Sequence, residues 1–160
     1  MTEQIQKAAR ELVSLLREKN ITLSAAESCT GGWFAKSVVD VPGASAVFAG
    51  GVVSYANGVK ERVLGVPEAL LARYTAVSSP VAAAMAEGVR RLIGTDMAVS
   101  VTGLAGPDGG TADIPVGRVY LGLAREGQTE TLTLDLPGNR EQVRCAAVLC
   151  MMKEIIKRLT

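Results

Sequence analysis

The chain of 160 residues is long enough for one domain, and a composition of 48% hydrophobic and 21% charged residues supplies the apolar side chains that a packed core needs. Lys and Arg number 17, Asp and Glu number 16, and aromatic residues make up 4%. The sequence thus offers neither the basic face nor the stacking rings typical of nucleic-acid binding, and we expect a single domain over residues 1–160 with no nucleic-acid partner.

The first part of the chain alternates predicted helices with apolar strands. Ile5, Ala8, Leu12 and Leu16 recur at the spacing of one helix face. No run approaches the ~18 apolar residues of a membrane span, and the first residues are amphipathic rather than a leader, so we expect no membrane partner. The predicted elements are a helix over 3–19 that ends near Asn20, a buried strand over 21–28, a helix over 31–40, a strand over 46–55 and a short helix over 58–65.

The second part ends in two strands with clear alternation of apolar and polar residues, which is typical of an antiparallel pair. Within this part, a glycine-rich segment over 103–115 has too little apolar content to pack on its own and is a predicted loop. The predicted elements are a short helix over 67–74, a helix over 81–94 that Ser78, Ser79 and Pro80 start, a strand over 96–103, strands over 116–126 and 128–138, and a helix over 139–159.

Local signals mark several boundaries of these elements. Thr30 with the following glycine pair is expected to open the helix over 31–40, and Asn57 and Asn139 are expected to cap later helices. The paired Gly50 and Gly51 predict a bulge or a close backbone approach within their strand.

Helices that alternate with apolar strands predict an α/β fold, a three-layer α/β/α sandwich around a mixed, mostly parallel sheet. In such sheets ligands collect beyond the carboxyl ends of the strands. Ser28, Tyr55 and the Thr102-Gly103 pair all fall at such ends.

Histidine and cysteine usage excludes several kinds of site. The chain has no histidine, which removes the Ser-His and Cys-His catalytic groups and the usual nitrogen ligand of zinc. Its three cysteines are odd in number and have no CxxC spacing, which favours reduced thiols and a cytoplasmic location. We expect no metal and no cofactor.

The stretch "ESCTGG" over residues 27–32 places two candidate nucleophiles where a strand turns into a helix. Ser28 is the better candidate, because unpaired backbone N–H groups of the following residues could hold an oxyanion there. The alternative for Ser28 is simple helix capping. Cys29 has no imidazole to hold a thiolate, and its alternative is a small buried packing residue.

Without histidine, a desolvated lysine is a candidate base. Burial without a counter-charge disfavours the ammonium and can lower a lysine pKa by as much as ~3–5 units. Lys60 follows Tyr55 closely enough to face the same cleft, although most lysines are solvated surface residues. Arg140 and Arg144 begin the last helix and could bind a phosphate, or form a solvated face with Glu141.

The segments "AAESCTGGW", "GGVVSYANGVK", "VSVTGLAGPDGG", "PVGRVYLGLA" and "GNREQVR" together resemble the CinA C-terminal domain family, the nicotinamide-nucleotide amidohydrolases. The resemblance covers nearly the whole chain and keeps the motifs in order. It implies an α/β/α sandwich and metal-free hydrolysis of the carboxamide of nicotinamide mononucleotide to nicotinic acid mononucleotide and ammonia. The resemblance also leads us to expect a homodimer.

Carried to this chain, the resemblance implies Ser28 as nucleophile, Lys60 as base and Tyr55 as an aid to proton transfer. Two other functions stay open: a nucleotide-binding regulatory domain without turnover, and a Ser/Lys amidase for another small carboxamide. The residues expected to bind the nucleotide substrate, through backbone N–H groups, the glycine-rich loop or the arginines, are Cys29, Thr30, Gly31, Thr102, Gly103, Ala105, Gly106, Arg140 and Arg144.

Overall fold

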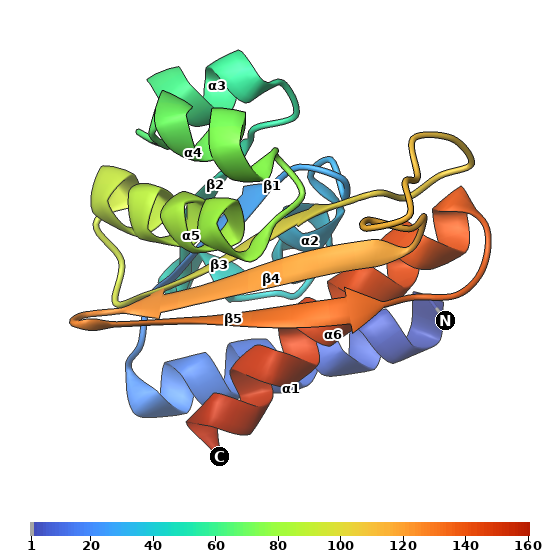
Figure 1. Ribbon diagram of the computed structural model, residues 1–160. Coiled ribbons are helices and arrows are strands. Elements are labelled where there is room, and N and C mark those ends of the chain that lie inside the picture. The colour runs from blue at the N-terminus through green and yellow to red at the C-terminus, as the bar shows by residue number, and fades with distance from the viewer. Residues whose placement is uncertain (1) are drawn as a thin grey trace.

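A five-stranded β-sheet forms the middle layer of the protein (Figure 1), in a computed structural model that describes residues 2–160. The strands lie in the order β2-β1-β3-β4-β5. Their bounds are β1 Leu23–Glu27, β2 Phe48–Val53, β3 Met97–Gly103, β4 Arg118–Arg125 and β5 Gln128–Asp135.

Two groups of helices cover the two faces of the sheet (Figure 1). On one face lie α1 (Thr2–Lys19), α2 (Trp33–Val39) and α6 (Arg140–Leu159), which share the larger hydrophobic core. On the other face lie α3 (Asn57–Arg62), α4 (Glu68–Tyr74) and α5 (Ser79–Ile93). The core on this second face is smaller, and its buried members are Ala26, Leu64, Val66, Leu71, Val81, Met85, Val89 and Ala98.

The sheet is mixed. Strand β1 pairs in parallel with β2 and β3, whereas β4 is antiparallel to both β3 and β5. Four of the five strands therefore run in one direction, and the predicted three-layer α/β/α sandwich with a mostly parallel sheet is confirmed. The predicted antiparallel pair is β4 and β5. Within residues 2–160, no helix combines the length and apolar composition needed to cross a membrane.

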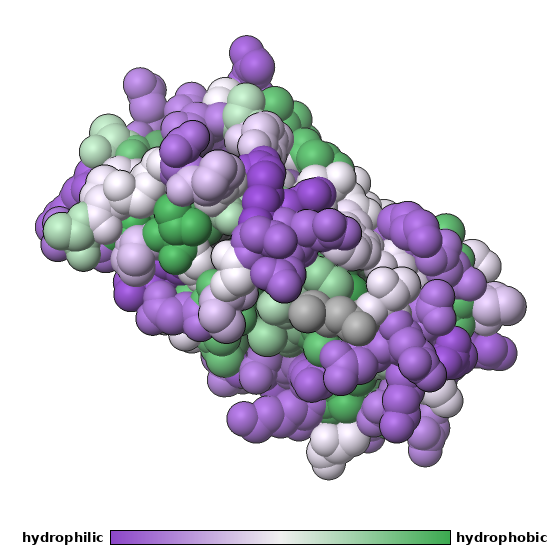
Figure 2. Space-filling model, turned by 90° about the vertical axis from the view of Figure 1, so that its right-hand side faces the viewer, coloured by the Kyte–Doolittle hydropathy of each residue, from purple (hydrophilic) through white to green (hydrophobic). Residues whose placement is uncertain are grey.

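Strand direction brings several chain segments to one edge of the sheet. Strands β1, β2 and β3 end there, and α6 begins there shortly after β5 ends. The loop between β3 and β4 projects from the same end of the molecule (Figure 1). The face shown in Figure 2 carries mostly hydrophilic side chains with separate, small hydrophobic patches.

The predicted helix starts have different outcomes. Asn139 caps α6 in a capping box, where its side chain accepts from Gln142 N–H and the Gln142 side chain accepts from Asn139 N–H. Asn57 is wrong as a cap, because it is the first helical residue of α3 and Ala56 precedes it without a side-chain bond. Thr30 does not cap α2 either, since its hydroxyl donates to Glu27.

Both predicted features of the glycine pair in β2 are present. The pairing of β1 with β2 shifts register between Leu23 and Ser24, whose partners are Phe48 and Gly50. A Cβ on Gly51 would lie 2.8 Å from the carbonyl oxygen of Ala25. The second glycine thus permits close packing of β2 on β1.

Gly88 permits α5 to approach the segment after α3. A Cβ at this position would overlap the carbonyl oxygen of Leu64, a backbone atom that cannot move aside cheaply. We expect Gly88→Ala to lower the free energy of unfolding by about 1–3 kcal/mol in urea titrations, despite the better helix propensity of alanine. The neighbouring exposed Glu87→Ala is the control and should change stability by under ~0.5 kcal/mol; equal stability of Gly88→Ala and wild type would contradict the close approach.

Candidate active site

Ser28 lies directly after β1, at the edge of the sheet where the parallel strands end. Its N–H donates to Val101 O over 3.0 Å, which extends the pairing of β1 with β3 by one residue. The carbonyl of Ser28 then accepts from Gly31 N–H at 3.1 Å, and this bond closes a tight turn. Ser28 is 8% exposed, so a small part of it faces the outside.

Lys60 belongs to α3, which lies on the other face of the sheet from α6, and its side chain reaches Ser28. Its side chain is 1% exposed, and its Nζ lies 3.1 Å from Ser28 Oγ. Two backbone carbonyls also contact the amine, Ser54 O at 2.6 Å and Tyr55 O at 3.2 Å. The predicted meeting of Ser28 and Lys60 is therefore present.

The two carbonyls orient the amine as well as bind it. A neutral lysine has two N–H donors and one lone pair, and carbonyl oxygens can only accept. When Ser54 O and Tyr55 O hold the two N–H groups, the lone pair is left for the Ser28 hydroxyl. In the ammonium form Lys60 Nζ donates to Ser28 Oγ. In the neutral form the Ser28 O–H would donate to Lys60 Nζ instead, which is the arrangement of a nucleophile and its general base.

Burial favours the neutral form of this amine. Desolvation lowers the pKa of Lys60 below its ordinary 10.5. No carboxylate forms an ion pair with Lys60 among residues 2–160, and its polar contacts are a hydroxyl and two neutral carbonyls. The site thus has the physical features of a lysine base.

Both alternatives for this pair are excluded by the contacts. Ser28 is no helix cap, because Gly32 occupies the N-cap position of α2 and its helix start has no side-chain cap. Lys60 is no solvated surface lysine, because it is among the most buried side chains of the protein.

Cys29 has the environment of a packing residue. It is 6% exposed, and burial raises the pKa of its thiol to about 12. At neutral pH the thiol is therefore protonated, whereas cysteine chemistry needs the thiolate. Ser28 is the nucleophile that the geometry favours.

Only part of the predicted set of oxyanion donors is available. Gly31 is wrong as a donor, because its N–H is already bonded to Ser28 O. Thr30 is fully buried and does not line the pocket. Cys29 lines the pocket, and its N–H has no backbone acceptor in another residue within 2–160.

A pocket of about 120 Å³ opens beside Ser28. This volume is below the ~300–1,000 Å³ of a full ligand site, so it suits the reacting end of a substrate whose remainder lies outside. Arg140 crosses its rim, donating from Nη1 to Gly106 O at 2.8 Å and from Nη2 to the Tyr55 hydroxyl at 3.3 Å. The lining residues are Ser28, Cys29, Tyr55, Gly103, Leu104, Ala105, Gly106, Asp108 and Arg140.

Two predicted binding residues have other contacts. Thr102 is 1% exposed, and its hydroxyl donates to Ala76 O at 2.7 Å, so its side chain anchors β3 to the segment before α5. Arg144 donates from Nε to Cys29 O at 2.9 Å and from Nη2 to Thr30 O at 3.1 Å. Neither residue lines the pocket.

Sequence reasoning missed Glu27, which organises the turn after β1. This carboxylate is 2% exposed and accepts from Thr30 Oγ1, Phe34 N–H and Ala35 N–H. It therefore satisfies the first N–H groups of α2. The distance of seven and eight residues in sequence lies outside the usual capping pattern, so no local motif marks it.

Asp108 and Leu104 also line the pocket; they lie in the loop over 102–109 that was expected to hold the substrate, but neither was predicted individually. We expected the glycine-rich loop to contribute backbone groups. The spacing of its glycines does not indicate that the exposed carboxylate of Asp108 lies at the rim of the pocket. Ser54 escaped notice because it contributes only a carbonyl, to Lys60.

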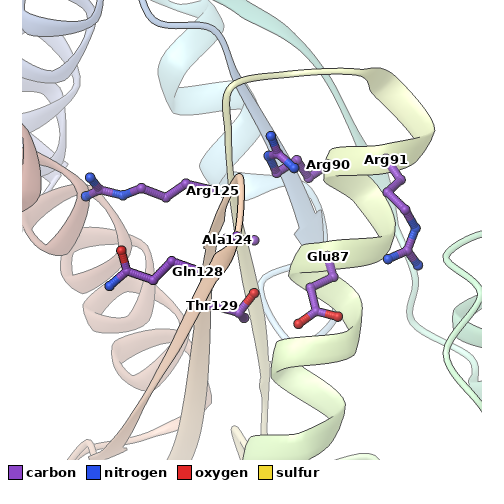
Figure 3. A pocket seen from close by; sticks show the side chains of 8 residues that line it. Glu87, Arg90, Arg91, Ala124, Arg125, Gln128 and Thr129 are labelled. Carbon is purple, nitrogen blue, oxygen red and sulfur yellow. The ribbon is translucent and has the colours of Figure 1, made fainter.

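A larger cavity of about 490 Å³ lies at the opposite end of the sheet, between α5 and the β4–β5 hairpin. Figure 3 shows that Arg91 and Arg125 extend away from each other, with Glu87 and Thr129 between them. The three arginines that line this cavity do not converge on one point, so it lacks the arrangement of a single anion site (Figure 3).

The family model described as the CinA C-terminal domain matches residues 5–159. This chain belongs to that family. A CinA-like protein of Geobacter sulfurreducens is 50% identical over 145 residues, which are 91% of this chain and 35% of the relative. One of Geotalea uraniireducens is 49% identical over 148 residues, 92% of this chain and 35% of the relative. The chain thus spans about a third of the length of these curated relatives.

Solved structures of CinA proteins have the same fold. A CinA superfamily protein of Klebsiella pneumoniae superposes with a TM-score of 0.94 at 32% identity, covering 97% of both chains. A competence/damage inducible protein of Agrobacterium tumefaciens gives a TM-score of 0.93 at 36% identity, covering 96% of this chain and 94% of the other. The CinA domain fold of this chain is therefore shared over almost its full length.

Proposed function

We propose that this CinA domain hydrolyses the carboxamide of nicotinamide mononucleotide to nicotinic acid mononucleotide and ammonia. The observation that carries the proposal is the 3.1 Å contact between Lys60 Nζ and Ser28 Oγ, made by an amine that is 1% exposed. A buried amine beside a hydroxyl is the arrangement of a Ser/Lys hydrolase, and the nucleotide substrate follows from the family resemblance.

In the first half of the reaction, neutral Lys60 accepts the Ser28 proton while Ser28 Oγ forms a bond to the carboxamide carbon. Lys60, now an ammonium, donates a proton to the amide nitrogen, the C–N bond breaks, and ammonia leaves. Water then attacks the acyl ester, Lys60 accepts its proton, and Ser28 Oγ departs with a proton from Lys60. One acid/base group of this kind contributes roughly 10²–10⁴-fold in rate.

Backbone amides at the pocket support charge on the carboxamide oxygen. Cys29, Ala105 and Gly106 line the pocket, and their N–H groups have no backbone acceptor in another residue within 2–160. Each such donor is worth roughly 10²–10³-fold when it holds an oxyanion. These three amides are the proposed donors: Cys29 is kept from the predicted set, and Ala105 and Gly106 replace Thr30 and Gly31.

Arg140 is the proposed phosphate ligand. It is exposed at the pocket rim, and it donates to two neutral oxygens, Gly106 O and the Tyr55 hydroxyl, rather than to a carboxylate. A guanidinium with free charge and a fork of donors suits a phosphate group. The hydroxyl of Tyr55 is bonded to Arg140, and its role in proton transfer stays a proposal.

The decisive test is ammonia release from a panel of amides with and without a 5′-phosphate. We expect turnover of nicotinamide mononucleotide and much slower turnover of nicotinamide riboside and nicotinamide. A thermal-shift measurement in parallel tests the regulatory alternative, since a large rise in Tm without ammonia would favour a binding domain. Turnover of an unrelated carboxamide alone would instead favour another amidase.

Replacement of Cys29 separates the two candidate nucleophiles. Because its thiol is protonated at neutral pH, we expect Cys29→Ala to keep kcat for ammonia release within about threefold of wild type, a change under ~0.7 kcal/mol in barrier. Loss of turnover in a folded Cys29→Ala protein, together with activity in Ser28→Ala, would establish a thioester route.

The pH profile reports the charge of Lys60. Because only the neutral amine accepts a proton, kcat/KM is expected to rise about tenfold per pH unit below the folded pKa of Lys60 and to level off above it. Desolvation lowers that pKa, so the plateau should begin below the ordinary 10.5. A profile that falls as pH rises through this range would identify the ammonium as the form required in the free enzyme.

A homodimer and a cytoplasmic location are further expectations from the resemblance and from the cysteine content. Sedimentation equilibrium of the purified chain tests the first, and fractionation of the source cells tests the second.

A further inference from the structure

The Arg144 side chain binds the turn that begins at Ser28, and we infer that Arg144 is a positioning residue for the nucleophile rather than a phosphate ligand. The inference rests on the function proposed above. It concerns a different set of contacts from the Ser28–Lys60 pair, namely those that α6 makes with residues 29 and 30.

The guanidinium binds two consecutive carbonyls of the turn. Nε donates to Cys29 O at 2.9 Å and Nη2 donates to Thr30 O at 3.1 Å. Thr30 O also accepts from Trp33 N–H, whereas the only donor to Cys29 O within residues 2–160 is Arg144. Removal of Arg144 therefore leaves one carbonyl of the turn without a partner, which is costly in a half-buried position.

The side chain of Arg144 is itself held in place. Its guanidinium stacks over the Trp33 ring, with 5.5 Å between Cζ and the ring centroid. Arg144 thereby joins α6 to the start of α2 and to the turn between β1 and α2. Its planar fork can reach both carbonyls at once, which the single ammonium of a lysine cannot do in the same geometry.

Two charged groups fix this turn from different sides. Glu27 binds the N–H groups at the start of α2, and Arg144 binds the carbonyls of the turn. The turn contains two glycines with positive φ, Gly31 (60°) and Gly32 (97°), and glycine can adopt many other conformations. Arg144 selects the conformation in which Ser28 Oγ meets Lys60 and Cys29 lines the pocket.

A kinetic comparison of three positions in α6 tests the inference, with nicotinamide mononucleotide as substrate. We expect Arg144→Met to lower kcat about 10²-fold, the loss that a displacement of ~1 Å can cause, with KM changed by less than threefold. Arg144→Lys should lose less. Arg140→Met should instead raise KM for the phosphorylated substrate, and the exposed Glu141→Ala is the control without effect.

Chemical rescue distinguishes positioning from general loss of stability. Guanidinium at about 20 mM should restore at least a tenth of wild-type kcat to Arg144→Ala and should not lower the raised KM of Arg140→Met; circular dichroism and Tm establish which variants fold. If Arg144→Met or Arg144→Lys is folded and keeps kcat while KM rises, Arg144 is a substrate ligand and the inference is overturned. If wild type itself releases no ammonia, the proposed function fails, and the inference fails with it.

Discussion

Ser28→Ala is expected to abolish ammonia release, with kcat lowered by about 10⁴-fold or more, the scale of loss when a nucleophile is removed. The reason is that Ser28 lines the pocket and its hydroxyl lies 3.1 Å from the Lys60 amine. The measurement is coupled detection of ammonia under saturating nicotinamide mononucleotide.

The substitution should leave the fold intact, because it removes one oxygen atom and keeps the backbone bonds of Ser28 to Val101 and Gly31. An unchanged Tm and a retained Kd for the substrate are the controls. Ser54→Ala is a matched serine control, since its contribution to the site is a carbonyl. Activity of Ser28→Ala within tenfold of wild type would rule out attack by this oxygen.

Lys60→Met is expected to lower kcat by about 10²–10⁴-fold, the contribution of a general acid/base group. Methionine has a similar length and is uncharged, so it tests the amine and not the volume of a side chain that is 1% exposed. It leaves Ser54 O and Tyr55 O without this donor, at a cost of ~1–3 kcal/mol for unpaired polar groups. Removal of a buried amine partly offsets that cost, because the amine no longer has to be desolvated.

Lys60→Arg is the informative second variant. Arginine stays protonated in proteins, so it provides donors and charge and cannot act as a base. We expect it to be as inactive as Lys60→Met. Retention of a tenth or more of wild-type kcat by either folded variant would remove the lysine from the chemistry.

The fold was predictable because its signals are local and repeated. The amphipathic spacing of Ile5, Ala8 and Leu12 reports the buried face of α1. The alternation in β5 matches a strand with one exposed face, whereas β4 is buried on both faces from Leu121 to Ala124. The prediction at Asn57 is wrong by one residue. Ala56 occupies the N-cap position of α3, and the helix begins without a side-chain cap.

Ser28 and Lys60 were predictable as a pair because each stands near the end of a neighbouring parallel strand, and such ends meet at one edge. The absence of histidine left lysine as a candidate base. The roles of Arg144 and Glu27 were not predictable. Arg144 binds backbone carbonyls 114 and 115 residues away, and Glu27 binds backbone N–H groups seven and eight residues away. No pattern of side chains in the sequence predicts which backbone atoms such a residue will contact.

Lys60, the proposed base, lies on the face of the sheet that has the smaller core. Lys60 belongs to a helix of six residues, α3, in the layer that shares the smaller core. Segments with few buried contacts open by local unfolding at a lower free energy than the whole domain. Each such opening would hydrate the amine and return its charge, so we expect the proposed activity to be lost on heating while the rest of the sandwich is still folded.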